Sequence, residues 1–219
     1  MYRIPSETLN RLIFEMNKEG VQKKFKKTGI NDTRLKLLTE VINGRLNVSC
    51  PDIWDIERYA LKYLLPEEYK SLALGDHCYS SGDLYEYDPP KNGQNIIKHG
   101  LSFGDVVSYS TKFGTLLVPC PNEEDGERVV IFSDIFLKDK NISLSLDNID
   151  FSEENYTLSI AQPRNGKFRF ISSRLLSKNS YKENMGQAFK DIYKEEKESK
   201  NAFVDRCVEI IKRDLLKTV

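Results

Sequence analysis

The chain has 219 residues, which allows one large domain or two small ones. Lys and Arg number 33, and Asp and Glu also number 33, so the formal net charge is zero and whole-chain charge gives no argument for nucleic-acid binding. The four cysteines are scattered without a CxxC pair, which argues against a disulfide framework or a zinc site, and no cofactor or metal is predicted.

The sequence shows no sign of a membrane or secretory segment. No apolar run approaches the ~18 residues that a membrane helix needs, and the first residues lack the apolar core of a signal peptide. We therefore expect a cytoplasmic protein with no membrane partner.

Residues 6–75 predict only helices, because apolar residues recur at helical spacing. Ser6 is expected to cap the first helix, Asn31 or Asp32 the third, and Asp52 the fourth. Pro66 stands at the favoured first position of a fifth helix. Glycines are expected to end the first three helices: Gly20, Gly29 and Gly44.

From residue 84 the pattern changes to mixed strands and helices. A short strand is expected at 84–87, and the prolines at 89–90 begin a helix to about His99. Asn165-Gly166 is a hairpin-turn signal between two strands. The expected strands lie at 115–118, 128–132, 142–146, 156–161 and 168–172, and charged helices at 181–217. The predicted class is α+β, with an all-helical domain (1–75), a small antiparallel sheet with helices (76–182) and a C-terminal helical extension (183–219).

Four short segments of the central region occur in a particular order. They are Tyr85-Glu86-Tyr87-Asp88-Pro89-Pro90, Lys98-His99-Gly100-Leu101-Ser102-Phe103, Gly126-Glu127-Arg128, and Phe168-Arg169-Phe170-Ile171-Ser172-Ser173-Arg174, with Tyr181 shortly after. This order and spacing over residues 84–182 resembles the BrnT ribonuclease toxins of bacterial toxin–antitoxin pairs. The resemblance implies the small RelE-like fold, RNA as substrate, an antitoxin protein as partner, and an active face containing Lys98, His99, Glu127, Arg128, Arg169 and Arg174.

These residue types suit cleavage of RNA without a metal. Attack on phosphorus by the neighbouring 2′-hydroxyl needs a base, an acid, and cations for the charge that builds on the phosphate. His99 has an ordinary pKa near neutral, and arginine offers a planar fork that matches phosphate oxygens. Arg169 and Arg174 are five positions apart, so an ideal strand would point them to opposite faces unless the strand turns near its end.

Each of these residues also has an ordinary structural explanation. His99 could be a helix C-terminal residue, where a positive charge suits the helix dipole. Arg169 could be a solvated residue of an alternating strand. Glu127 and Arg128 could form a surface ion pair of little consequence.

Residues 8–65 resemble the helix-turn-helix domains of phage repressors. The matching segments are Gly20-Val21, Lys27-Thr28-Gly29-Ile30-Asn31, and Val41-Ile42-Asn43-Gly44-Arg45-Leu46-Asn47-Val48-Ser49. The resemblance implies a recognition helix over 32–42 that enters the major groove of DNA. The DNA-facing candidates are then Arg34, Lys36, Thr39, Asn43 and Arg45.

Residues 1–75 are mildly basic, with 13 Lys and Arg against 10 Asp and Glu. The best candidate for binding phosphate is the cluster Lys23, Lys24, Lys26 and Lys27. The alternative is a solvated face of a helical domain that serves folding or partner contact.

Three functions remain open from the sequence. The first is a metal-independent endoribonuclease of toxin type, which Lys98-His99 and the two arginines of the last strand favour. The second is a DNA-binding regulator with an inactive toxin-like domain, and the third is a protein that binds another protein through its sheet. The family's acidic residue is absent at 177–180 and an insertion lies around 138–155, and both departures favour the second and third.

Overall fold

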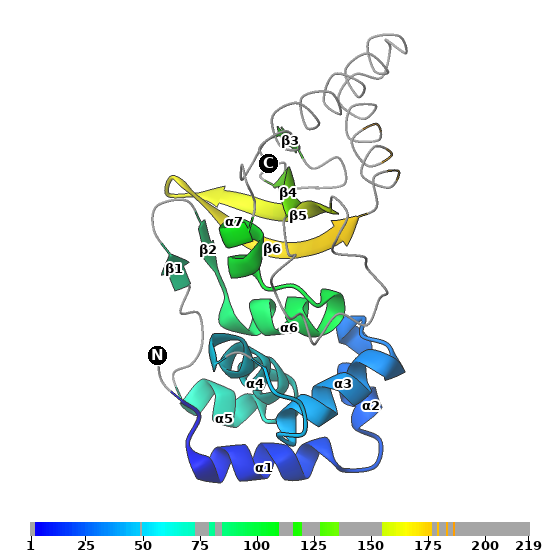
Figure 1. Cartoon of the computed structure of the whole chain (residues 1–219). Helices are drawn as coiled ribbons and strands as arrows, with labels where there is room; N and C mark the ends of the chain where they lie inside the picture. Colours follow the sequence, from blue (N-terminus) through cyan, green and yellow to red (C-terminus); the bar gives the residue numbers. More distant parts are fainter. Residues whose placement is uncertain are drawn as a thin grey trace. The chain divides into compact units, whose positions relative to one another are not determined.

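The computed structural model describes residues 3–48, 50–72, 79–81, 85–109, 116–119, 128–135 and 155–176, with single residues at 179, 183 and 186. The chain divides into two compact units, of which unit 1 comprises 1–81, 86–102 and 142–146, and unit 2 comprises 82–85, 103–141 and 147–219. Helices dominate unit 1 and the sheet dominates unit 2 (Figure 1). The predicted α+β class is confirmed.

The five helices expected in residues 6–75 are all present. Their bounds are α1 Ser6–Met16, α2 Val21–Phe25, α3 Asp32–Ile42, α4 Cys50–Leu64 and α5 Pro66–Ser71, and a 3₁₀ turn, η1 Lys26–Thr28, follows α2. The predicted helix α6, Pro89–His99, is also present and belongs to unit 1. The predicted boundary between residues 75 and 76 stays a prediction, although α6 clusters with the helices that precede it.

Local signals set some of the helix ends. The expected cap of α1 at Ser6 is wrong, because Pro5 holds the N-cap position without a side-chain hydrogen bond, and α1 ends at Met16, before Gly20. The Asn31 side chain accepts a hydrogen bond from the Arg34 N–H at 2.9 Å, so Asn31 rather than Asp32 caps α3. The expected start of α4 at Asp52 is wrong, because α4 begins at Cys50. Pro51 is tolerated in the first turn, where no intrahelical N–H bond is needed, and Asp52 suits the positive end of the helix dipole.

An aromatic group lies in the core of unit 1. The rings of Phe25 and Tyr59 are 5.7 Å apart, and the Tyr63 ring lies 5.9 Å from Phe25 and 5.3 Å from Tyr59. Phe25 and Tyr59 are almost wholly buried. Tilted and edge-on aromatic pairs of this kind add to the stabilisation from burial. These ring contacts therefore stabilise the packing of the short helix α2 on α4.

Helix α6 packs closely on α4 at a glycine. A Cβ at Gly93 would lie 2.1 Å from the carbonyl oxygen of Asp55 and 2.7 Å from the backbone nitrogen of Ile56. These neighbours are backbone atoms of α4, which cannot rotate away. Only glycine allows the two helices to approach this closely.

Polar side chains are buried beside this contact. The Asn92 amide donates to Asp55 Oδ2 at 2.8 Å, and the Arg58 guanidinium lies 3.4 Å from Asp55 Oδ1. All three side chains are buried. Burial raises the pKa of Asp55 from its ordinary 3.8 to about 7, against the opposing Asn92 hydrogen bond and Arg58 charge.

The strands form a six-stranded sheet in the order β1-β2-β6-β5-β4-β3. Their bounds are β1 Tyr79–Ser81, β2 Tyr85–Tyr87, β3 Leu116–Pro119, β4 Val129–Ile135, β5 Asn155–Arg164 and β6 Lys167–Leu176. The pairs β3–β4, β4–β5 and β5–β6 are antiparallel. Asn165 and Gly166 both have positive φ, so the predicted hairpin turn is confirmed.

One helix and one strand were not predicted. Helix α7, Phe103–Tyr109, lies within unit 2, and the Phe103 ring packs 5.3 Å from the Phe170 ring of β6. Strand β1 lies in a segment that was expected to be a connector. The expected strand at 142–146 and helices at 181–217 lie outside the described residues, apart from single positions. In the described part of the chain no helix combines the length and apolar character needed to span a bilayer.

Replacing Gly93 tests the α4–α6 contact. We expect Gly93→Ala to lower the free energy of unfolding by about 3 kcal/mol or more, at the upper end of overpacking costs, because backbone atoms must separate. Urea denaturation measures the change. Gly44→Ala is the control, since Gly44 has a positive φ but open space around it, and it should cost only about 1–2 kcal/mol. Equal losses in the two variants would contradict the close contact.

The buried carboxyl of Asp55 predicts a pH dependence of stability. An unfolded Asp deprotonates near its ordinary pKa of 3.8, whereas the folded group holds its proton up to about pH 7. The folded state therefore binds more protons between these values, and the free energy of unfolding falls as pH rises through this window, by on the order of 3–4 kcal/mol. Asp55→Asn should flatten this fall in urea titrations at several pH values. The exposed Glu67→Gln should leave it unchanged, and an Asp55→Asn protein with the parent's pH profile would refute the assignment.

Candidate functional site

A register shift in β6 controls which face of the sheet its side chains occupy. Ile160 of β5 pairs with Ser172, but the next residue, Ala161, pairs with Phe170. Ile171 is therefore an extra residue without a partner on β5, which defines a β-bulge. One extra residue reverses the alternation of faces for everything that follows it.

The bulge brings Arg169 and Arg174 to the same face. Arg169 pairs with Gln162 and Arg174 with Leu158, and these partners are four residues apart on β5 without a shift between them. Directly paired residues share a face, and so do residues an even number apart in one regular strand. Arg169 is half-buried and Arg174 is exposed. The expectation for an ideal strand, opposite faces, is therefore wrong, and the reason is the bulge rather than a turn at the strand end.

Burial on the other face agrees with this assignment. Phe170 and Ser173 are three residues apart, yet both are buried. They pair with Ala161 and Ser159, which are also buried. The Ser159 and Ser173 hydroxyls are 2.8 Å apart and hydrogen-bonded, so this face contains a satisfied polar pair beside the Phe103–Phe170 contact.

Arg128 comes level with Arg169 across the sheet. Val129 of β4 pairs with Ala161, so continuing the register by one residue places Arg128 opposite Gln162, which itself pairs with Arg169. Arg128 is exposed. Because neighbouring strands are about 4.8 Å apart, the Cα atoms of Arg128 and Arg169 are separated by about 10 Å in this register. We name Arg128, Arg169 and Arg174 the arginine face. Sequence reasoning missed Gln162, since only the register shows that it lies between two of these arginines.

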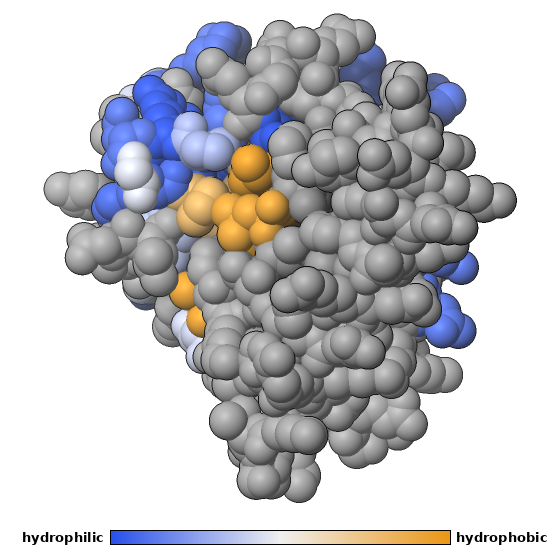
Figure 2. All heavy atoms as spheres, turned by 90° about the horizontal axis from the view of Figure 1, so that it is seen from above, coloured by the Kyte–Doolittle hydropathy of each residue, from blue (hydrophilic) through white to orange (hydrophobic). Residues whose placement is uncertain are grey.

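The arginine face is not purely polar. It also contains Leu158 and its partner on β4, Phe132, and both are buried. The arginine face therefore combines guanidinium groups with buried apolar side chains. On the side of the molecule seen in Figure 2, residues coloured orange for high hydropathy lie beside residues coloured blue for low hydropathy.

Lys98 and His99 form the last turn of α6 in unit 1. Gly100 follows with φ 73°, and its N–H donates to the Ile96 carbonyl at 2.7 Å. The Asn95 amide donates to the Leu101 carbonyl at 2.8 Å, which holds the chain after the helix. Both Lys98 and His99 are half-buried, and the C-terminal end of a helix favours a cation.

The predicted catalytic residues thus fall into two groups. Lys98 and His99 belong to unit 1, and the arginine face belongs to unit 2. Glu127 and Tyr181 lie outside the described residues. Across the described segments, no cluster of three or more His, Cys, Asp and Glu side chains has the placement to bind a metal ion.

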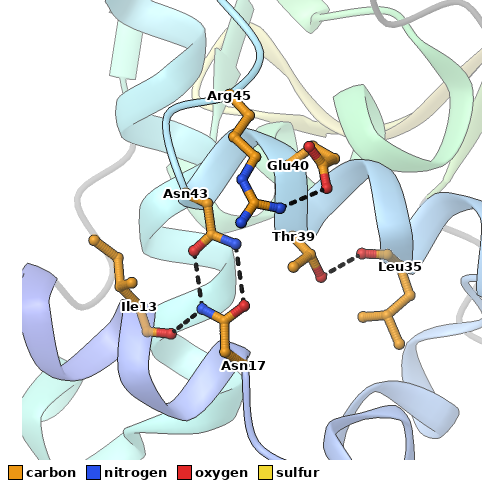
Figure 3. A network of polar contacts seen from close by, with 7 residues as sticks. All are labelled: Ile13, Asn17, Leu35, Thr39, Glu40, Asn43 and Arg45. Atoms are coloured by element: carbon orange, nitrogen blue, oxygen red, sulfur yellow. Dashed lines mark hydrogen bonds and ion pairs between the residues drawn. The ribbon is translucent and has the colours of Figure 1, made fainter.

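Three of the DNA-facing candidates, Thr39, Asn43 and Arg45, are engaged in internal contacts (Figure 3). Asn43 exchanges two amide hydrogen bonds with Asn17 of α1, at 2.9 and 3.1 Å. Arg45 pairs with Glu40 at 3.2 Å, and the Thr39 hydroxyl donates to the Leu35 carbonyl at 2.9 Å. To contact a base, Asn43 would have to give up both bonds.

Arg34 must be removed from the set of DNA-facing candidates. It is only 8% exposed, so it is not a surface contact for DNA. Lys36 is exposed on the same helix, and Lys23 and Lys24 are exposed on α2. The exposed cations of the helical unit therefore include these lysines, while the residue types that read bases are buried or paired.

Comparison with known proteins gives no relative. No protein-family model matches the chain, and neither a curated protein nor a solved structure matches it. The resemblances to BrnT toxins and to phage repressors therefore stay predictions.

Proposed function

We propose that this protein is a metal-independent endoribonuclease of toxin type that cleaves single-stranded RNA. The observation that carries the proposal is the shared face of Arg169 and Arg174, which exists because of the bulge at Ile171. Two guanidinium groups on one face can hold the oxygens of one phosphodiester or of two adjacent ones. The resemblance of residues 84–182 to BrnT toxins, which includes these two arginines, supports the same activity.

The proposed reaction needs one proton acceptor and one proton donor. The 2′-hydroxyl oxygen attacks the phosphorus, and its proton passes to a base. The bond from phosphorus to the 5′-oxygen breaks, and an acid protonates the leaving oxygen, so the products carry a 2′,3′-cyclic phosphate and a 5′-hydroxyl. His99 is the proposed proton-transfer group, while Lys98 and the arginine face stabilise the negative charge on the phosphate oxygens.

Removal of His99 tests the proton-transfer step. A long end-labelled RNA incubated with the full chain in EDTA should be cleaved, and His99→Ala should slow cleavage about 100-fold or more, as expected for loss of a general acid or base. The matched control is His77→Ala, which removes the other histidine of the chain and should cleave at the parent rate. Equal cleavage by the parent and His99→Ala would show that His99 has no such role. An intact RNA together with tight, specific binding of duplex DNA would favour the regulator instead.

Substitutions on the arginine face test transition-state stabilisation. Arg169→Lys and Arg174→Lys keep the charge but lose the planar fork, and each should lower the cleavage rate by about 10-fold. Arg169→Gln and Arg174→Gln should each lower it by about 100-fold, similar to loss of an oxyanion-stabilising donor. Arg11→Gln is the control, because Arg11 is an exposed arginine of α1 paired with Glu68. If Arg169→Lys and Arg169→Gln both leave the cleavage rate close to that of the parent, Arg169 does not contact the reacting phosphate.

A further inference from the structure

Unit 1 carries lysines that form no ion pair with an acidic residue in the part of the chain that the structure describes. The segment from residue 20 to 31 contains Lys23, Lys24, Lys26 and Lys27 and no Asp or Glu. All four lysines are exposed. Elsewhere in the described segments, lysines such as Lys18 and Lys70 pair with a carboxylate, whereas none of these four does.

The fold directs these lysines outward. Phe25 and Thr28 are buried, and Phe25 is fixed between the Tyr59 and Tyr63 rings. In a helical turn, residues two positions before and after a buried residue point away from it, and residues one position away lie at the flanks. The four lysines therefore surround the side of α2 and η1 that faces away from the core.

Lys98 of α6 joins the same region. Its Nζ lies 3.2 Å from the position that a Cβ would occupy at Gly29, the residue after η1. The Gln94 side chain of α6 donates to the Thr28 carbonyl at 3.1 Å, which holds the two segments together. Lys98 has no ion pair among the described residues either. We name Lys23, Lys24, Lys26, Lys27 and Lys98 the lysine surface.

The chemistry of the lysine surface fits an extended polyanion. Five ammonium groups raise the local positive potential, so bound anions would stabilise the arrangement. Lysine is a point charge without the planar fork that selects geometry, and contacts of this kind bind a phosphate backbone without reading sequence.

We propose that the lysine surface of unit 1 binds the phosphodiester backbone of the single-stranded RNA substrate. The proposal rests on the ribonuclease function for the identity of the polyanion. RNA is favoured over duplex DNA for two reasons. Lys98 directly precedes His99 in the last turn of α6, and the candidates for reading DNA bases are buried or paired, as Arg34 and Asn43 show. The helical unit is then a substrate-binding unit rather than a reader of an operator.

The test measures binding separately from cleavage. A fluorescently labelled, fully 2′-O-methylated RNA of mixed sequence has no 2′-hydroxyl to attack, so anisotropy reports binding alone. For the full chain, log K against log salt concentration should fall with a slope of about −3 or steeper, at ~0.7 per contacted phosphate. Replacing Lys23, Lys24, Lys26 and Lys27 together by Gln should weaken binding at least about 10-fold and make the slope shallower by about 3, because four contacts of this kind are lost.

Controls separate the possible outcomes. Lys18→Gln with Lys70→Gln, two exposed lysines with acidic partners, should leave the affinity within about twofold, and circular dichroism checks that every variant is folded. His99→Ala should bind like the parent even where it fails to cleave, so failed cleavage with intact, lysine-dependent binding overturns only the ribonuclease proposal. An unchanged affinity and slope in the quadruple variant would overturn the lysine surface. So would tighter, lysine-dependent binding of duplex DNA of the same length.

Discussion

The close contact of α4 with α6 at Gly93 is the constraint on which the arrangement of unit 1 depends. The two backbones approach so closely that even a methyl group would overlap the Asp55 carbonyl. Polar side chains beside such a contact are shielded from water and need hydrogen-bond partners within the protein. Asp55 finds them in Asn92 and Arg58. Because this contact fixes α6, it also fixes the position of Lys98 at Gly29. A buried structural feature thus determines where Lys98, a half-buried residue of the proposed site, lies.

In unit 2 a single extra residue has a comparable effect. Without Ile171 as an unpaired residue, Arg169 and Arg174 would alternate to opposite faces, and Arg174 would not belong to the arginine face. The same shift lets Phe170 and Ser173 both point to the buried face, where Phe103 of α7 packs on Phe170. The bulge therefore serves packing on one face and charge placement on the other, so core stability and the arginine face depend on the same backbone irregularity.

The features that the sequence predicted well are local ones. Apolar periodicity predicted α1 to α6, the capping residue Asn31 predicted the start of α3, and Asn165-Gly166 predicted the hairpin. The features it missed are set by tertiary contact: the start of α4, the helix α7, the bulge, and the glycine contact at Gly93. Arg34 is an intermediate case, because it lies four residues before Leu38 and therefore on the apolar stripe of α3, so its burial could have been predicted.

The two kinds of cation suit two different steps of the proposed reaction. Lysines on a fixed backbone attract and retain a polyanion through charge alone, and this attraction weakens as salt rises. Arginines on a strand hold phosphate oxygens in defined directions, which matters most when charge builds in the transition state. The exposed lysines 23, 24, 26 and 27 lie in unit 1. The arginines that share one face of the sheet lie in unit 2. Under this division, loss of Lys23, Lys24, Lys26 and Lys27 should act mainly on substrate affinity, and loss of the arginines mainly on the rate of the bound complex.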